Sequence, residues 1–228
     1  MVRVGVLVFI FSLYMFSSKG YSSKRKSMIE SISCYGTGLK GTLVFLHGME
    51  DPSRRGAFLK DELILKKIAD ELNVKVALPR SGLTCNSSSK VCWNMFTSLT
   101  SVEKLLKDIQ SRSGRCFRVG QKTIYIGFSN GGYFLNKVSQ HCLLKHDDRI
   151  ISIGSAGSVI KNSHHDKACS GLHLMVSSEE RTYPETLRFY LALQKLKRRV
   201  GLSVHSGYHR IPYPELKNLL QIMLKTSG

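Results

Sequence analysis

Continuous apolar runs and amphipathic runs alternate along the chain beyond residue 40. Six short runs are apolar on both sides of the backbone, which is typical of strands buried in a parallel sheet; they cover residues 41–48, 74–79, 123–129, 149–154, 171–177 and 202–205. Between them, apolar residues recur at three- or four-residue spacing, which predicts helices near residues 64–72, 102–109, 134–142, 184–198 and 212–223. This alternation predicts the α/β class, with a mostly parallel sheet of about six strands flanked by helices.

The helix near residues 102–109 carries a signature of its first turn. Thr100 and Glu103 stand three residues apart, the spacing at which each side chain can bind a backbone amide at the start of a helix. We therefore expect this helix to begin at a capping box formed by Thr100 and Glu103.

The first forty residues differ from the rest of the chain. Residues 4–16 are almost wholly apolar and follow Arg3, which is typical of a secretory signal peptide, and they are shorter than the roughly 20 residues of a membrane-spanning helix. We expect a signal peptide over residues 1–20, whose cleavage leaves no transmembrane anchor. An uncleaved anchor or a buried strand is the alternative. Residues 21–40 are polar and predict an extended lead-in, which places the folded domain at residues 41–228.

Composition and charge narrow the classes of function. Hydrophobic residues make up 42% of the 228 residues, which is enough for a core and excludes a predominantly disordered chain. There are 34 Lys and Arg against 16 Asp and Glu, a formal net charge of +18. The basic residues are scattered rather than interleaved with aromatic residues, so we expect no specific nucleic-acid partner. The charge is compatible with long-range attraction to anionic surfaces or polymers, and solvated helix faces are the preferred alternative.

The six cysteines are an even number, as expected for disulfides in an oxidising compartment. Cys85 and Cys92 lie close together in a polar loop and are the best candidates for a pair. The pairing of the other four stays open, as does the alternative that the cysteines are free buried thiols. No Cys or His spacing is typical of zinc, and we expect no metal and no cofactor. The sequence thus predicts a secreted or periplasmic protein.

One motif carries a candidate nucleophile. Gly127, Ser129 and Gly131 form a G-x-S-x-G pattern. The pattern alone is common, but here it joins a predicted strand to a predicted helix, where a nucleophile elbow lies. A serine on so tight a turn takes strained backbone dihedrals, and flanking glycines let neighbouring backbone approach. Ser129 is therefore the expected nucleophile.

A serine hydroxyl needs a base to take its proton, and the base needs an acid to orient it. In this architecture the order along the chain is serine, acid, histidine. His209, between the last strand and the last helix, is the preferred base, with His205 as the alternative. Glu180, just after the fifth predicted strand, is the preferred acid, with Glu179 as its close alternative. Asp166 is a weaker one because no strand delivers it.

The reaction also needs two N–H donors that stabilise a developing oxyanion. The backbone amide of Asn130, directly after the nucleophile, is the first. The second is expected from the loop after the first strand, at the amide of Met49, where Gly48 permits a tight turn. His47 in that loop is expected to be a structural residue rather than a second base.

With these motifs the chain resembles the α/β-hydrolase superfamily over roughly residues 41–225. Residues 92–96, Cys-Trp-Asn-Met-Phe, further resemble a segment of secreted polyhydroxybutyrate depolymerases and feruloyl-esterase-like hydrolases. That resemblance implies that Trp93 lines the substrate pocket. The chain departs from these relatives in offering a glutamate where they usually carry an aspartate as the acid. It is also small, with no inserted lid domain, which implies an open site.

The sequence therefore predicts an exported serine esterase that cleaves carboxylic esters, polyesters or aryl esters among them, through an acyl-enzyme on Ser129. The expected partner is an ester substrate, either a small molecule or a polymer. Two alternatives stay open. One is a peptidase or amidase with the same triad, and the other is a non-catalytic binding protein of the same fold whose basic surface holds an anionic partner.

Overall fold

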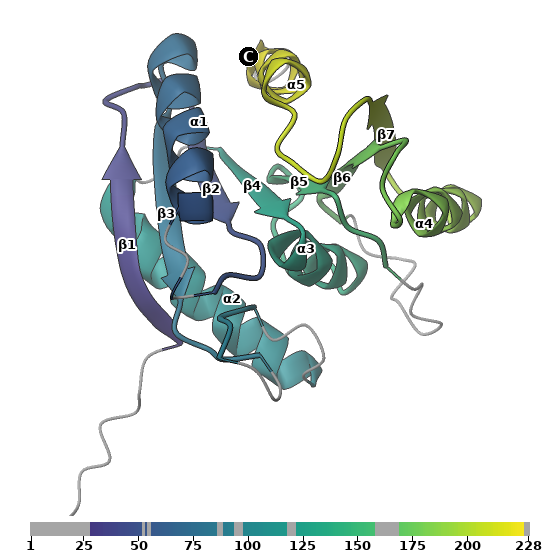
Figure 1. Ribbon diagram of the computed structural model, residues 1–228, viewed down its shortest axis with the longest axis horizontal. Coiled ribbons are helices and arrows are strands. Elements are labelled where there is room, and N and C mark those ends of the chain that lie inside the picture. The colour runs from purple at the N-terminus through teal and green to yellow at the C-terminus, as the bar shows by residue number, and fades with distance from the viewer. Residues whose placement is uncertain are drawn as a thin grey trace, which may run out of the picture.

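The computed structural model describes residues 28–51, 53, 56–85, 89–93, 98–117, 122–157 and 169–225. Within these residues, a seven-stranded sheet in the order β1-β3-β2-β4-β5-β6-β7 is flanked by five α-helices (Figure 1). The strands are β1 (Ile29–Tyr35), β2 (Thr42–Leu46), β3 (Lys75–Ser81), β4 (Thr123–Phe128), β5 (Arg149–Ile153), β6 (Gly171–Ser177) and β7 (Val200–His205). The helices are α1 (Gly56–Leu72), α2 (Leu99–Ser113), α3 (Asn130–Gln140), α4 (Tyr183–Lys195) and α5 (Tyr213–Lys225), with a 3₁₀ turn, η1 (Gly114–Cys116), after α2.

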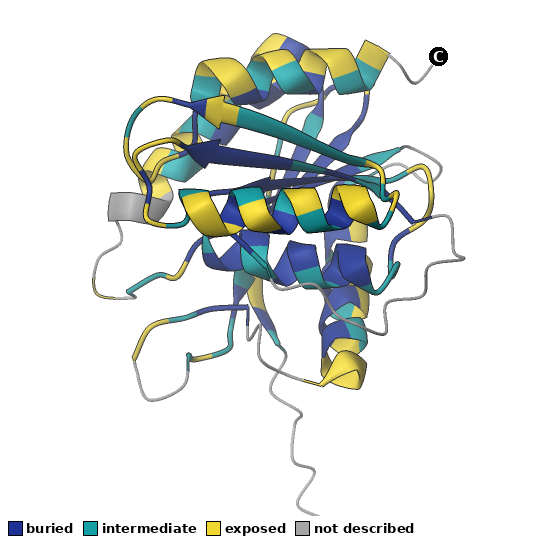
Figure 2. Cartoon of the chain, turned by 90° about the vertical axis from the view of Figure 1, so that its right-hand side faces the viewer, coloured by how far each residue is buried: buried dark blue, intermediate teal, exposed yellow. Residues whose placement is uncertain are grey.

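Helices cover both faces of the sheet. α1 and α5 pack on one face, and α2, α3 and α4 pack on the other (Figure 1). Because successive side chains of a strand point to opposite faces, Leu43 and Phe45 of β2 join the core on the first side, and Val44 and Leu46 join the core on the second. All of β2 is buried, which explains its continuous apolar run. The outer helices, such as α2 and α5, instead alternate buried and exposed residues, whereas α3 is almost wholly buried (Figure 2).

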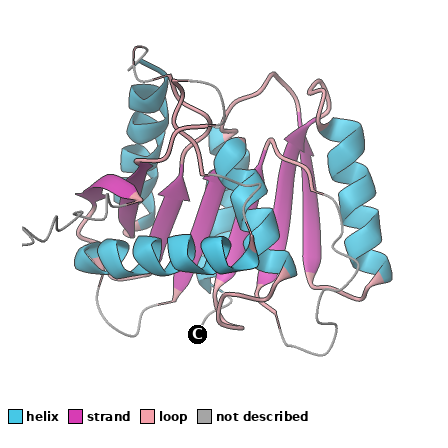
Figure 3. Cartoon of the chain, turned by 90° about the horizontal axis from the view of Figure 1, so that it is seen from below, coloured by secondary structure: helices cyan, strands magenta, loops and turns pink. Residues whose placement is uncertain are grey.

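The parallel strands bring distant parts of the chain to one edge of the sheet. β2 to β7 run parallel, so their carboxyl ends point the same way (Figure 3). The loops that follow β2, β4, β5, β6 and β7 therefore meet at this edge. The predicted α/β class and the mostly parallel sheet are confirmed.

Two sequence expectations need correction. The sheet has one strand more than the six expected, because β1 lies within residues 21–40, which were expected to form a lead-in. β1 pairs antiparallel with β3, so the sheet begins at Ile29. The predicted capping box at Thr100 and Glu103 is also wrong. α2 begins earlier, and its N-cap is Ser98, whose Oγ accepts a hydrogen bond from the Ser101 amide at 3.4 Å.

All six cysteines lie in three disulfide pairs. The expected Cys85–Cys92 pair is present, with 5.5 Å between the two Cα atoms. Cys34 pairs with Cys116 (Cα–Cα 5.4 Å) and Cys142 with Cys169 (Cα–Cα 4.7 Å), within the usual range for a disulfide. The alternative of free buried thiols is therefore wrong.

The predicted signal peptide, residues 1–20, lies outside the described residues. In the part of the chain that the structure describes, no helix combines the length and the apolarity that a bilayer-spanning segment requires.

Candidate active site

Ser129 occupies a sharp turn between a strand and a helix. β4 ends at Phe128 and α3 begins at Asn130, so Ser129 alone joins them. Its backbone has φ 50° and ψ −112°, a strained conformation for a residue with a side chain. The Ser129 amide donates to the Ile153 carbonyl at 2.8 Å, and the Ser129 carbonyl accepts from the Tyr133 amide at 3.0 Å. The backbone thus has the strand–turn–helix form of a nucleophile elbow.

The glycines beside Ser129 are sterically required. A Cβ on Gly127 would lie 2.5 Å from the carbonyl atoms of Gly131, and one on Gly131 would lie 2.2 Å from the Leu46 carbonyl oxygen. Both contacts are with backbone, which cannot swing aside as a flexible side chain can. The Gly131 amide also donates to the His47 carbonyl at 3.1 Å. The turn therefore packs directly against the end of β2.

We expect Gly131→Ala to destabilise the fold by about 3 kcal/mol, since the added methyl group overlaps backbone of the central strand β2. For a chain of this size, the midpoint Tm of thermal unfolding should fall by about 6–12 °C. Gly114→Ala is the matched control. Gly114 has a helical φ of −54°, and a Cβ there meets nothing within 4 Å, so its Tm should shift by less than about 2 °C. Equal Tm values for the two variants would contradict the steric argument.

His209 and Glu180 meet at the same edge of the sheet. Glu180 follows β6 and His209 follows β7. The His209 Nδ1 lies 3.0 Å from Glu180 Oε2, so Nδ1–H donates to the carboxylate and Nε2 is left to accept a proton. The imidazole packs on the ring of Phe128, the residue before Ser129, with 4.7 Å between ring centroids.

The loop after β5 contacts the same pair. Gly154 has a positive φ of 58°, and a Cβ there would lie 2.8 Å from His209 Cε1 and 3.2 Å from Glu180 Oε2. Gly154 directly follows Ile153, whose carbonyl binds the Ser129 amide. The contact of Gly154 with His209 and the bond of Ile153 to Ser129 thus bring the serine, the histidine and the carboxylate to one small region.

Glu180 is buried, whereas His209 is half exposed, with relative side-chain exposures of 4% and 45%. Burial alone would raise the pKa of the Glu180 carboxyl. The hydrogen bonds from His209 and from the Thr182 hydroxyl (2.9 Å), together with the charge of His209, outweigh that effect and lower the pKa. Glu180 therefore stays ionised at neutral pH, as an orienting acid must.

The alternatives for these two residues lie elsewhere or have other partners. Glu179 is exposed, and its Oε1 accepts from the Gly207 amide at 2.9 Å. His205, the last residue of β7, is buried, and its Nδ1 donates to the Ser206 carbonyl at 3.1 Å. Asp166 lies outside the described residues. Of the two glutamates, it is Glu180 that contacts His209.

The expected oxyanion donors come from two segments beside Ser129. Asn130 is the first residue of α3, so its amide lies at the positive end of the helix dipole. Met49 lies in the loop after β2, which passes so close that a Cβ on Gly48 would lie 3.3 Å from the Ser129 Cβ. The roles of Asn130 and Met49 stay predictions.

His47 is fully engaged in this loop. Its Nδ1 donates to the Gly48 carbonyl at 2.6 Å, and its Nε2 accepts from the Ser81 amide at 3.1 Å. Burial lowers the pKa of the imidazole to about 4, and the nearby Arg80 charge acts in the same direction. His47 is therefore neutral at neutral pH, with both ring nitrogens bonded, as expected for a structural residue.

Trp93 does not line a pocket, contrary to what the resemblance implied. Its side chain has no exposed surface. The indole packs against the His47 ring, with 4.9 Å between centroids, and against Phe134 at 6.5 Å. A side chain without accessible surface cannot touch a substrate in this conformation, so any effect on a reaction must pass through the residues that Trp93 contacts.

Two partly buried carboxyl groups lie near the site. Burial raises the pKa of Glu50 to about 7 and that of Asp61 to about 6, with Arg80 opposing the shift at Glu50 and His209 opposing it at Asp61. Both groups therefore carry less than a full negative charge near neutral pH. Among the described residues, no group of three or more His, Cys, Asp or Glu side chains is arranged to hold a metal ion.

Comparison with known proteins gives structural matches alone. No protein-family model matches the chain, and no curated protein matches it. A carboxylesterase of Bacillus cereus is 14% identical, with a TM-score of 0.62 over 87% of this chain and 95% of that one. A carboxylesterase of Mesorhizobium loti is 12% identical, with a TM-score of 0.59 over 80% of this chain and 89% of that one. The fluorophosphonate-binding serine hydrolase F of Staphylococcus aureus is 16% identical, with a TM-score of 0.56 over 82% and 84%.

The chain has the α/β-hydrolase fold. Within this fold, Glu180 contacts His209, Ser129 lies beside them through Ile153 and Gly154, and Glu179 binds the Gly207 amide instead. Two contributors were not predicted from the sequence: Gly154, which lies against the imidazole, and Thr182, whose hydroxyl donates to the carboxylate. The available signal for Gly154 was its position at the end of an apolar run. Nothing in the local sequence pattern marks Thr182.

Proposed function

We propose that this protein is an exported serine hydrolase that cleaves carboxylic esters through an acyl-enzyme on Ser129. The observation that carries the proposal is the strained turn at Ser129, set beside a histidine whose Nδ1 lies 3.0 Å from a buried carboxylate. Strain of this kind persists where the surrounding structure holds it, and it clusters at catalytic sites. The carboxylesterases and the fluorophosphonate-binding hydrolase of the same fold support the same chemistry.

In the proposed reaction, His209 Nε2 takes the proton of the Ser129 hydroxyl while the serine oxygen attacks the ester carbonyl carbon. The carbonyl oxygen becomes an anion that the amides of Asn130 and Met49 stabilise. When the intermediate collapses, the bond to the alcohol oxygen breaks and the imidazolium returns its proton to the leaving alcohol. Water then attacks the acyl group by the same route and frees Ser129. Glu180 holds the Nδ1–H tautomer and stabilises the imidazolium.

Export and substrate class are parts of the same proposal. The apolar run at residues 4–16 and the three disulfides support export to an oxidising compartment, outside the cell or in the periplasm. The described residues contain no domain inserted between strands, which favours an open site for esters of small molecules or of polymers. The net charge of +18 would favour approach to anionic surfaces.

A fluorophosphonate probe tests the proposal directly, because it reacts with an activated serine. We expect one labelled site per molecule, on the peptide that contains Ser129. The same preparation should hydrolyse p-nitrophenyl esters and leave p-nitroanilides intact. Cleavage of the anilides would favour the peptidase or amidase alternative. A folded, disulfide-intact protein that is neither labelled nor active on esters would overturn the proposal.

A further inference from the structure

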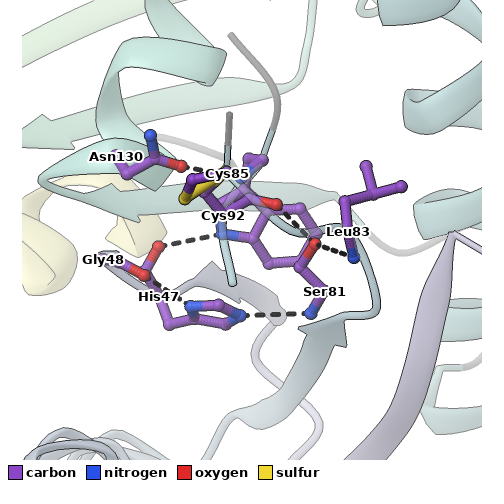
Figure 4. The surroundings of a disulfide bond; sticks show 8 residues. His47, Gly48, Ser81, Leu83, Cys85, Cys92 and Asn130 are labelled. Atoms are coloured by element: carbon purple, nitrogen blue, oxygen red, sulfur yellow. Dashed lines mark hydrogen bonds between the residues drawn. A yellow bond between two sulfur atoms is a disulfide. The ribbon is translucent and has the colours of Figure 1, made fainter. Parts of the chain in front are cut away.

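Trp93 connects the two segments expected to donate to the oxyanion. Its indole Nε1–H donates to the His47 carbonyl at 2.8 Å, and its backbone N–H donates to the Asn130 side-chain Oδ1 at 2.7 Å (Figure 4). His47 lies two residues before Met49, and Asn130 is the residue after Ser129. One buried residue therefore binds the loop after β2 through its ring and the start of α3 through its backbone.

The position of Trp93 is fixed by the neighbouring disulfide loop. Cys92, the residue before Trp93, is bonded to Cys85. The Cys92 amide donates to the Leu83 carbonyl at 3.0 Å, and the Ser81 hydroxyl donates to the Cys92 carbonyl (Figure 4). Ser81 is itself the last residue of β3, and its amide binds His47 Nε2 at 3.1 Å. The loop is thus tied to the sheet on one side and to the His47 ring on the other.

We propose that Trp93, braced by the Cys85–Cys92 disulfide, is a positioning residue that holds the Met49 loop and the start of α3 at the separation required for an oxyanion hole. The proposal rests on the proposed function, since it names the parts that align two of its expected donors. Trp93 touches no substrate and acts through His47 and Asn130.

Packing alone does not account for these contacts. A buried aromatic ring without an N–H would keep most of the packing, and the His47 carbonyl already accepts from the Gly131 amide at 3.1 Å. The indole N–H is thus a second donor to an acceptor that already has one. The Gly131 bond already joins the loop to α3, so what the second bond adds is a further restraint on the same carbonyl from Trp93, which also binds Asn130. Displacement of a reacting group by about 1 Å can cost about 100-fold in rate, so a small movement of the loop is enough to matter.

Trp93→Phe removes the indole donor and keeps a buried ring. We expect kcat for a p-nitrophenyl ester, counted per fluorophosphonate-labelled site, to fall by about 10-fold or more while KM changes less than about twofold. Counting labelled sites removes the effect of any misfolded fraction. Tyr125→Phe is the matched control. Tyr125 lies in the same core, and its hydroxyl accepts from Gln110 Nε2 at 3.2 Å, so this change also deletes one polar group of a buried ring.

The Cys85→Ala/Cys92→Ala double variant tests the brace and should lower kcat per labelled site in the same direction. A Trp93→Phe protein with the kcat and KM of the Tyr125→Phe control would overturn the positioning role while leaving the esterase proposal intact. An inactive, unlabelled wild type would instead remove the proposed function. In that case hydrogen exchange decides. Faster amide exchange over residues 47–51 and 129–135 in Trp93→Phe would support the positioning role of Trp93. Unchanged exchange would overturn that role.

Discussion

Replacing Ser129 with alanine is expected to lower kcat for an activated ester by about 10⁵-fold, leaving only the slow reaction that binding alone supports. The loss should be this large because the attacking oxygen is removed while the strained turn stays in place (φ 50°). Initial rates with p-nitrophenyl acetate, corrected for the buffer rate, measure it. The fold should be unaffected, since the side chain removed is one hydroxyl group on a partly exposed residue.

Two further variants, His209→Ala and the double variant Ser129→Ala/His209→Ala, test whether the serine and the histidine act together. If the serine and the histidine act as one unit, each single variant costs about as much as the double variant, because removing either part disables the other. Independent contributions would multiply instead. A Ser129→Ala protein with more than about a tenth of the wild-type kcat would exclude Ser129 as the nucleophile.

The fold was largely predictable because its sheet is mostly parallel and is covered on both faces. Strands such as β2 then become continuous apolar runs between amphipathic helices, and the order of these runs gives the class. The edge strand β1 was not predicted, because most of its residues are not buried. Only Ile29 in it is buried, and a register shift between Ile29 and Ser31 breaks the alternation that would mark a strand with one exposed face. Its polar residues therefore resembled a linker.

Those site residues were predictable that follow from the order of the chain and from the positions of the strand ends. Ser129 and His209 follow strands at fixed places in a recurring architecture. The choice between Glu179 and Glu180 depended on the conformation of the turn after β6. A shift of one residue in this turn changes which carboxylate faces His209. The Glu180 amide binds the Ser177 carbonyl at 3.2 Å, and this turn directs Glu180 to His209 and Glu179 to Gly207. No hydrophobic pattern encodes such a turn.

The burial of Trp93 could not be predicted from the sequence, because a position in a loop does not indicate whether the side chain is buried. The pocket role of Trp93 was implied by the resemblance of residues 92–96 to a segment of depolymerases and feruloyl-esterase-like hydrolases. In the structure, the disulfide and the Ser81–Cys92 bond pull the loop inward, and the indole becomes part of the core between His47 and Phe134. The pairing of Cys34 with Cys116 was equally hidden, because the two lie 82 residues apart in sequence.

Glu180→Gln should produce the second large effect, a fall in kcat of about 10³- to 10⁴-fold at neutral pH. The carboxylate accepts the Nδ1–H of His209, which keeps Nε2 unprotonated and ready to take the serine proton. A glutamine can present its amide N–H to the ring instead, which favours the tautomer with the proton on Nε2. It also removes the negative charge that stabilises the imidazolium. Steady-state rates with a p-nitrophenyl ester measure the loss.

Glu179→Gln is the matched control, since it makes the same chemical change one residue away, on an exposed side chain bound to the Gly207 amide. Its kcat should stay within about threefold of wild type, because it does not contact the imidazole.

The pH dependence of stability gives a second measure of the interaction of Glu180 with His209. The folded-state pKa of Glu180 is lowered from 4.5, so its contribution to stability is fully present above that value and is lost as the pH falls through the folded-state pKa. The Tm difference between wild type and Glu180→Gln should therefore shrink as the pH is lowered below 4.5. If Glu179→Gln and Glu180→Gln lost the same activity, the assignment of Glu180 as the orienting acid would be wrong, because only one of the two carboxylates lies on His209 Nδ1.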